Sequence, residues 1–305
     1  MTALAIPLPL LSSKATTVCW GNLNKVEWSH GFSFTCYGIH FGVRVSDPAL
    51  LPMLHKRLPA DATASDAEVV DRYFSVILGG SEGNSRVRRY NVVYVDHVRF
   101  ARSHDLDDIL DSFETAVRLS TAELARNRVF IHAGAVGWNG KAIVLPGKSF
   151  VGKTNLVMEL VKAGATYYSD EFAVLDSVGR VHPYLKPLSL RENGSGRQRN
   201  IPVEEIGGRP GRKPLPVGLV VMSAYKPSAR WRPLTLSPGN GALALLSNTV
   251  SARRTPERVL ATLERMVSMA PVIEGKRGEA TVAASAAPPR WKNPPPRCAS
   301  SASIR

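Results

Sequence analysis

Cysteine is scarce in this sequence, and its spacing excludes two ways of holding a fold together. Three cysteines occur among 305 residues, Cys19, Cys36 and Cys298, and no two of them form a C-x-x-C pair. Cysteines this far apart predict neither a zinc site nor a disulfide framework. Reduced thiols are typical of the interior of the cell, so we expect a cytoplasmic protein.

Long apolar runs are absent as well. No stretch of the sequence approaches the roughly 20 consecutive apolar residues that a transmembrane helix needs, so we expect no membrane span. Residues 1–15, MTALAIPLPLLSSKA, are apolar, but they contain two prolines and lack the basic start of a signal peptide. We interpret this segment as a flexible leader.

Acidic residues are outnumbered by basic ones, 25 against 39, which gives a formal net charge of +14. A chain this basic is attracted to polyanions, among them nucleotides, nucleic acids and acidic proteins. Its basic residues are scattered, and the sequence has neither a helix-turn-helix pattern nor an aromatic–basic RNA-binding pattern. We therefore expect no specific nucleic-acid partner. Apolar residues make up 44% of the chain, enough for a substantial core.

The first third of the chain is predicted to be rich in β-strands. Residues 32–45 alternate apolar and polar side chains around Gly38, which is typical of a hairpin. Further strand-like stretches follow, and residues 105–127 then show the apolar spacing of a helix with acids at its start. We predict that residues 16–125 form a small antiparallel β-rich region that ends in a helix.

The second part of the chain has the pattern of an α/β domain, which we place at residues 126–285. Two short β runs flank Asn139-Gly140, a dipeptide that favours hairpins. The second run leads into a glycine-rich turn, an amphipathic helix and a further strand at 165–176, an order typical of α/β units. A right-handed crossover would make strand 165–176 parallel to the run before the turn, where it could lie beside it.

Two other segments are distinguished by their composition. Residues 191–213 are rich in glycine and carry six bases against three acids, which predicts a long loop. Such a loop could be a lid or a substrate-docking segment, or only a solvated connection. Residues 286–305 contain no acid and many prolines, serines and arginines, so we predict a disordered basic tail.

The turn before the predicted helix carries G-x-x-x-x-G-K-T, the Walker A or P-loop pattern. Its residues are Gly147, Lys148, Ser149, Phe150, Val151, Gly152, Lys153 and Thr154. Glycines let consecutive backbone N–H groups turn into one concavity that binds phosphate oxygens, and the following helix N-terminus adds donors. Lys153 would reach the β- and γ-phosphates, and the Thr154 hydroxyl would bind Mg²⁺. The apolar strand before the pattern and the helix after it favour nucleotide binding over a chance match.

An acid near the phosphates is the second requirement of such a site, because P-loop enzymes hold magnesium with a carboxylate from another strand. Asp170 and Glu171 lie on the strand after the P-loop helix. Neighbouring residues of a strand point to opposite faces, so only one can enter the site unless the strand bends. A solvated acidic pair is the alternative. His132, just before the run that leads into the loop, is either a half-buried structural histidine or a site residue.

These elements in this order resemble the catalytic domain of the bacterial HPr kinase/phosphorylase family, and more closely the stand-alone HPr-kinase-like serine kinases. The resemblance is carried by His132-Ala133-Gly134, AIVLPGKSFVGKT, LVKAGATYYSDEFAVLD, VHPYLKPLSLR and IEGKRGEA. It implies an α/β fold of the P-loop HPr kinase/phosphoenolpyruvate carboxykinase type, preceded here by the β-rich region. It also implies ATP and Mg²⁺ as cofactors and assembly into a homo-oligomer.

The resemblance implies roles for individual residues. Asp170 would take the proton from the attacking hydroxyl, Glu171 would lie close to the metal, and His132 would be the active-site histidine. Two positions depart from the family, since Asn155 and Glu171 stand where it has a glutamate and an aspartate. The segment that docks HPr has no clear counterpart, so we do not expect HPr to be the acceptor.

The expected function is that of an ATP-dependent kinase. It would transfer the γ-phosphoryl group to a hydroxyl, with a serine favoured, of a protein, a peptide or a small molecule. A non-catalytic ATP-binding partner or assembly protein is the alternative, because one acid of the family is missing. An ABC- or AAA-type ATPase fits less well, since the sequence has no LSGGQ-like segment.

Overall fold

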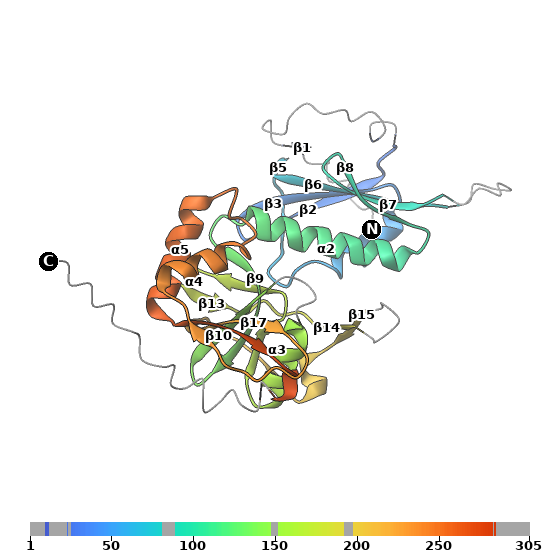
Figure 1. The fold of residues 1–305 in the computed structure, drawn as a ribbon. Helices are drawn as coiled ribbons and strands as arrows, with labels where there is room; N and C mark the ends of the chain where they lie inside the picture. Colours follow the sequence, from blue (N-terminus) through green and yellow to red (C-terminus); the bar gives the residue numbers. More distant parts are fainter. Residues whose placement is uncertain are drawn as a thin grey trace. The chain divides into compact units, whose positions relative to one another are not determined.

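The chain divides into two units, Met1–Asn127 and Arg128–Arg305 (Figure 1). The computed structural model describes residues 10, 11, 23, 26–80, 89–147, 152–191, 198–282 and 284. The boundary predicted from the sequence lay after residue 125. The predicted tail lies outside the described residues, as does the predicted leader apart from Leu10–Leu11, which form strand β1.

The first unit contains a six-stranded sheet in the order β4-β2-β3-β6-β7-β8. The bounds of its strands are β2 His30–Cys36, β3 Ile39–Val45, β4 Thr63–Ser65, β6 Arg72–Ile77, β7 Asn91–Val95 and β8 Val98–Ser103. Its other elements are β5 Val69–Val70, which pairs with β1, a 3₁₀ turn at Pro48–Leu50, and the helices α1 Leu51–His55 and α2 Leu106–Leu124.

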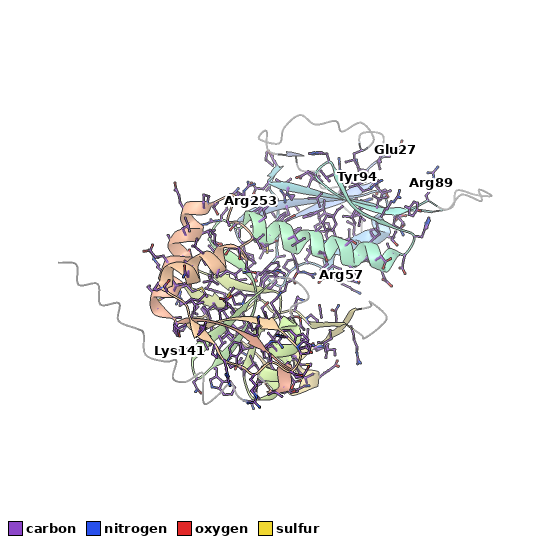
Figure 2. All side chains as sticks on the ribbon, in the orientation of Figure 1. Glu27, Arg57, Arg89, Tyr94, Lys141 and Arg253 are labelled. Atoms are coloured by element: carbon purple, nitrogen blue, oxygen red, sulfur yellow. The ribbon has the colours of Figure 1, made fainter. Side chains whose placement is uncertain are left out.

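Helix α2 is amphipathic and packs its apolar side on the core of this unit. Asp105 caps its first turn by accepting a hydrogen bond from the Asp107 N–H at 2.9 Å, which satisfies a backbone donor that the helix leaves unpaired. Phe113 of the helix meets Phe74 of β6 edge-on, with ring centroids 5.7 Å apart. Arg57, labelled in Figure 2, forms ion pairs with two acidic side chains of α2. The helix predicted at 105–127 is therefore confirmed.

The predicted hairpin around Gly38 is also confirmed, but the sheet is not antiparallel throughout. Tyr37 and Gly38 both have positive φ, 49° and 78°, which is the backbone that a two-residue hairpin turn requires. Strands β3 and β6, in contrast, are parallel. Parallel neighbours need a long crossover connection, and α1 and β4 lie in the segment between these two strands. No local pattern in the sequence predicts the crossover that makes β3 and β6 parallel.

The second unit contains a nine-stranded sheet with helices on both faces. Eight strands follow the order β16-β11-β9-β12-β13-β17-β19-β18, and β10 pairs with both β9 and β17. The strand bounds are β9 Val129–Trp138, β10 Lys141–Pro146, β11 Thr166–Ser169, β12 Phe172–Leu175, β13 Arg180–His182, β16 Arg209–Pro210, β17 Leu215–Tyr225, β18 Leu234–Thr235 and β19 Val272–Arg277. The helices are α3 Lys153–Lys162, α4 Pro238–Leu246 and α5 Pro256–Met269.

Side chains of this sheet alternate between two hydrophobic cores. On one face, Ile131 and Ala133 of β9 share a core with Leu263 of α5. On the other face, Val136 of β9 shares a core with Leu156 of α3. The period of two along a strand and the apolar stripe of each helix account for both contacts. Packing of α3 on the sheet fixes its N-terminus close to the end of β10.

The strand after the P-loop helix runs in the predicted direction but is not the neighbour of β10. Strands β10 and β11 both pair antiparallel with β9, so they are parallel to each other with β9 between them. The hairpin at Asn139 and Gly140, with φ of 48° and 74°, keeps β9 beside β10 and so takes that position. The single strand predicted at 165–176 is in fact two, β11 and β12, separated at Asp170 and Glu171.

The prediction of one long loop at 191–213 is wrong where the structure shows strands and a 3₁₀ turn, and residues 192–197 lie outside the described residues. Strands β14 Leu188–Arg191 and β15 Gln198–Ile201 form an antiparallel hairpin, followed by a 3₁₀ turn at Val203–Ile206 and by β16. The few apolar residues of this stretch explain the order, because Val203 is buried and Ile206 packs against the core under α3. Helix α4 was not predicted, since its sequence PGNGALALL contains two glycines, which are poor helix formers.

The structure bears on two expectations from the sequence, one about the few cysteines and one about the absence of long apolar runs. Cys36 is a buried free thiol, and Cys19 and Cys298 lie outside the described ranges. Among the helices that the structure describes, none has the length and the apolar character needed to cross a membrane.

Candidate phosphate-binding site

The predicted P-loop joins the end of β10 to the start of α3. Gly147, Gly152, Lys153 and Thr154 are described, whereas Lys148, Ser149, Phe150 and Val151 lie outside the described residues. Gly152 has φ of +76°, a backbone that side chains other than glycine rarely adopt. A Cβ atom on Gly152 would also lie 2.7 Å from Nη2 of Arg277. Glycine is therefore required at this position for both conformation and space.

Lys153 extends from the first turn of α3 back over the end of β10. Its Nζ donates a hydrogen bond to the Gly147 carbonyl oxygen at 2.6 Å and lies 3.5 Å from Nε2 of His132. Burial lowers the pKa of Lys153 to about 8, although Asp170 and Glu171 act in the opposite direction. The ammonium group thus stays close to the mouth of the loop and is charged at neutral pH.

His132 lies within β9, the strand that precedes β10 and pairs with it. Its backbone is fixed by the ladder, where its carbonyl oxygen accepts a hydrogen bond from the Gly147 N–H at 3.2 Å. Burial, and then the charge of Lys153, lower the pKa of His132 to about 4. The ring is therefore neutral at pH 7, and Nε2 can accept a hydrogen bond from the Lys153 ammonium.

Asp170 is the most enclosed carboxylate of the site, with a side chain only 2% exposed. Its Oδ2 accepts hydrogen bonds from the Thr154 hydroxyl at 3.1 Å and from the Ser189 N–H at 3.2 Å. Its Oδ1 accepts one from the Tyr167 hydroxyl at 3.0 Å and lies 3.3 Å from Nζ of Lys186. Four donors thus surround one carboxylate, which accounts for its tolerance of burial.

Glu171 shares a face with Asp170 because the strand bends between them. Ser169 makes the bend, since its Oγ accepts hydrogen bonds from the N–H groups of Glu171 and Phe172 at 3.1 and 3.0 Å. As a result, Nζ of Lys186 lies 3.3 Å from Asp170 and 3.6 Å from Glu171. The strict alternation of a regular strand, which would have separated the two carboxylates, does not apply here.

The spacing of two oxygen atoms in this cluster is compatible with a magnesium ion. Octahedral Mg²⁺ has ligands at about 2.1 Å, so neighbouring ligand atoms lie roughly 3 Å apart, and the Thr154 and Asp170 oxygens are 3.1 Å apart. The Lys186 ammonium next to the two carboxylates marks a position that suits a cation. Within the described ranges, no group of three His, Cys, Asp or Glu side chains could hold a metal. Magnesium commonly takes its remaining ligands from phosphate and water.

Burial of Tyr167 raises its pKa above the usual range, and the nearby Asp170 adds to the rise. The hydroxyl therefore remains a donor, shared between Asp170 and the Lys186 carbonyl oxygen at 2.9 Å. In this way Tyr167 links Asp170 to Lys186, which precedes the β14–β15 hairpin.

Sequence reasoning missed three side chains of the site, Lys186, Tyr167 and Arg277. Arg277 ends β19, is only 3% exposed, and donates from Nη2 to the Gly152 carbonyl oxygen at 2.9 Å. Burial lowers its pKa from the usual value. Lys186 and Arg277 lie in the segments VHPYLKPLSLR and IEGKRGEA, which the resemblance had marked without giving these residues a role. The contact of Lys186 with the two carboxylates and that of Arg277 with Gly152 depend on strand order, which the sequence did not reveal.

Asp176 lies in the segment VLDSVG, where an acid follows apolar residues as it does in the magnesium-binding strand of ordinary P-loop ATPases. In this structure Asp176 is a turn residue. Burial alone would raise its pKa, but hydrogen bonds from His182 and Arg180 outweigh burial and lower it to about 2. Its Oδ2 lies 2.9 Å from Nε2 of His182 and 2.9 Å from Nε of Arg180. The carboxylate holds together the β12–β13 turn.

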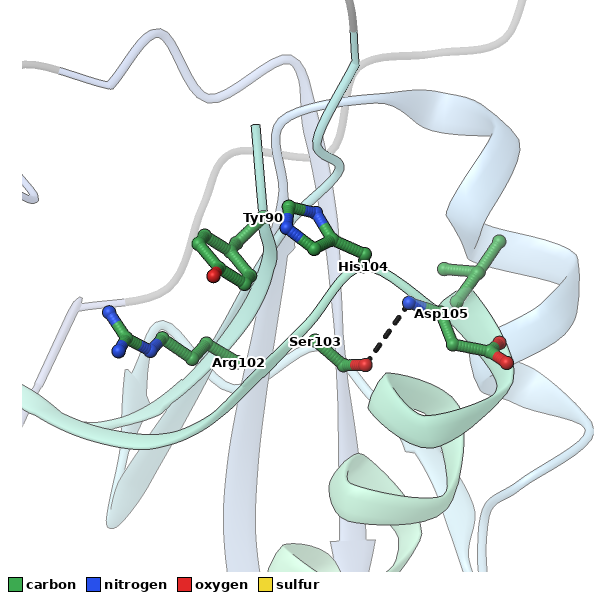
Figure 3. A pocket seen from close by; sticks show the side chains of 6 residues that line it. Tyr90, Arg102, Ser103, His104 and Asp105 are labelled. Atoms are coloured by element: carbon green, nitrogen blue, oxygen red, sulfur yellow. Dashed lines mark hydrogen bonds between the residues drawn. The ribbon is translucent and has the colours of Figure 1, made fainter. Parts of the chain in front are cut away.

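A shallow pocket of the first unit contains none of the predicted site residues (Figure 3). The rings of Tyr90 and His104 stack with centroids 3.8 Å apart, and the Arg102 guanidinium lies 5.0 Å from the Tyr90 ring. The Ser103 hydroxyl accepts a hydrogen bond from the Asp105 N–H at 3.1 Å. These contacts lead into the cap of α2, which is a structural role.

A scan against models of protein families found no match to this chain, and a search of curated proteins found no similar sequence.

Proposed function

We propose that this protein is an ATP-dependent kinase with a P-loop, which transfers the γ-phosphoryl group to a hydroxyl, with a serine favoured. The observation that carries the proposal is the 3.1 Å hydrogen bond between Thr154 and Asp170. It joins the first turn of the helix after the glycine loop to an acid from a separate strand. Triphosphate enzymes need both parts within reach of one metal ion.

The binding half of the mechanism uses the loop and α3. The N–H groups at the start of α3 would face bound phosphates and, with the positive end of the helix dipole, favour an anion there. Lys153 adds a charge close to the loop, and neutral His132 orients it by accepting a hydrogen bond. Arg277 donates to the Gly152 carbonyl and so supports the left-handed backbone of that residue. Magnesium, when bound, neutralises phosphate charge.

The two carboxylates divide the remaining work in this proposal. Asp170 Oδ2 faces Thr154, which supports Asp170 as the residue that would hold the metal with the Thr154 hydroxyl. Glu171 is the more exposed carboxylate, 21% against 2%, and an acceptor hydroxyl must arrive from solvent. We therefore assign to Glu171 the orientation and deprotonation of that hydroxyl. This division differs from the roles that the resemblance implies for the pair.

The test uses the full chain with γ-labelled ATP, Mg²⁺ and a library of serine-containing peptides. We expect label transfer that Glu171→Gln lowers by at least about a hundredfold, the usual contribution of a general base, with a smaller loss of metal affinity than Asp170→Asn shows. Asp170→Asn should lose transfer and weaken metal binding together. Lys162→Met, at an exposed position of α3, is the control and should behave as wild type.

Two outcomes would redirect the proposal. Nucleotide binding without transfer to any peptide or small hydroxyl compound would favour the alternative of a non-catalytic ATP-binding partner. Full transfer by Asp170→Asn would remove that residue from the site. Asn155, at the position where the resembled family has a glutamate, is only weak support for a non-catalytic protein, because its side chain is exposed.

A further inference from the structure

Lys186 occupies an unusual position for a lysine. Its side chain is only 13% exposed, and its Nζ lies within 3.6 Å of the carboxylates of both Asp170 and Glu171. The same Nζ donates a hydrogen bond to the Ser189 hydroxyl at 3.0 Å. Lysines are rarely buried unless they are paired, and here one ammonium contacts two carboxylates.

The two acids need such a cation. Adjacent carboxylates on one face of a bent strand repel each other, and the low dielectric of a buried site increases the repulsion. Asp170 has a further reason to stay in place, because it also receives the Thr154 hydroxyl and the Ser189 N–H. Without a positive partner this repulsion would push the two carboxylates apart.

A divalent cation at this site would meet the same carboxylates. The Thr154 and Asp170 oxygens already have the separation of neighbouring magnesium ligands. The Lys186 ammonium contacts the other oxygen of Asp170 and an oxygen of Glu171. Two cations this close to one another and to the same acids repel, so metal and ammonium compete.

We propose that Lys186 is an internal counter-ion that holds Asp170 and Glu171 in position without metal, and that a divalent cation must displace its ammonium group. The inference rests on the proposed function, because it takes the metal site from it. Lys186 therefore acts as a positioning residue. It maintains the geometry of the acids before the metal arrives and weakens metal affinity in return.

The experiment measures binding of Mn²⁺ alone, by electron paramagnetic resonance, to the full chain without nucleotide. We expect Lys186→Met and Lys186→Gln to bind Mn²⁺ about tenfold or more tightly than wild type, since an opposite or like charge within ~4–6 Å commonly changes such equilibria by one to three powers of ten. Without metal, both variants should melt at a lower temperature than wild type. Mn²⁺ should then raise their melting temperatures by more than it raises that of wild type.

Two controls separate this role from a general effect of charge or folding. Lys162→Met removes an exposed lysine that is paired with Glu159 at 2.8 Å on α3, and it should leave Mn²⁺ affinity unchanged. Lys186→Arg keeps the charge and should bind Mn²⁺ no more tightly than wild type. Circular dichroism of each variant checks that it is folded.

The outcomes are distinguishable. Equal or weaker Mn²⁺ binding by both neutral Lys186 variants, with binding intact in wild type, would overturn the counter-ion role and leave the kinase proposal standing. Binding of Mn²⁺ by neither wild type nor the variants, even with nucleotide present, would overturn both. Tighter binding by Lys162→Met to the same degree would show that only net charge matters and would also refute the role.

Discussion

Nucleotide affinity should depend on pH through Lys153, in a window where an ordinary lysine would show nothing. Burial lowers the pKa of this ammonium from 10.5 to about 8, with Asp170 and Glu171 opposing the shift. Only the protonated form attracts phosphate. A bound triphosphate holds the proton on Lys153, so above its pKa the free protein must take up a proton in order to bind.

The size of the effect follows from the fraction that is protonated. With a pKa of about 8, roughly 76% of Lys153 is charged at about pH 7.5 and only about 3% at about pH 9.5, so the dissociation constant should rise about 25-fold. A lysine with the usual pKa of 10.5 stays about 90% charged at about pH 9.5, and affinity would hardly change. Phosphate groups complete their last ionisation near pH 6, below this window.

The assay is isothermal titration calorimetry with a non-hydrolysable ATP analogue and Mg²⁺ at several pH values. Lys153→Met is the matched control, because it removes the titrating group and leaves the other lysines in place. This variant should bind weakly and with little dependence on pH. Wild-type affinity that stays constant from about pH 7.5 to about pH 9.5, or a decline that Lys153→Met shares, would refute the reasoning.

Three other residues give predictions of their own. Gly152→Ala should lower the free energy of unfolding by about 1–3 kcal/mol, because the left-handed backbone and the contact with Arg277 both oppose a Cβ. Urea denaturation measures this loss, and a variant as stable as wild type would contradict the prediction. Tyr167→Phe should cost about 1–2 kcal/mol by loss of the donor to buried Asp170, and an unchanged midpoint in the same assay would count against that hydrogen bond. His132 has a folded-state pKa of about 4, below its usual 6.5. The unfolded chain therefore binds a proton first, and stability should fall by about 2 kcal/mol or more as pH decreases from 6.5 to 4. His132→Gln should flatten that slope, and a variant with the wild-type slope would show that other groups cause it.

Local signals in the sequence predicted the parts of the fold that local interactions determine. The turn at Tyr37-Gly38 needs two residues with positive φ, and a glycine there with alternating strands on both sides is sufficient to indicate it. Helix α2 combines apolar periodicity with an acidic first turn and a capping aspartate. Each of these is stabilised mainly by residues close in sequence, so the pattern and the structure agree.

Pairings between distant segments could not be predicted in this way. The parallel contact of β3 with β6 and the pairing of β11 with β9 depend on which strands meet after long connections. The same limit applies to Lys186, which follows Asp170 only after a turn and two further strands. The sequence showed only that both acids could enter the site if the strand bends. It did not predict the bend at Ser169, because a serine in a strand does not by itself indicate a bend.

The measurement that tests the central claim most directly is a crystal structure of the full chain with a non-hydrolysable ATP analogue and Mg²⁺. We predict that the β- and γ-phosphates lie at the N-terminus of α3 beside Lys153, with the metal ion between the Thr154 hydroxyl and Asp170. A nucleotide bound elsewhere, or a metal ion that contacts neither Thr154 nor Asp170, would contradict the account.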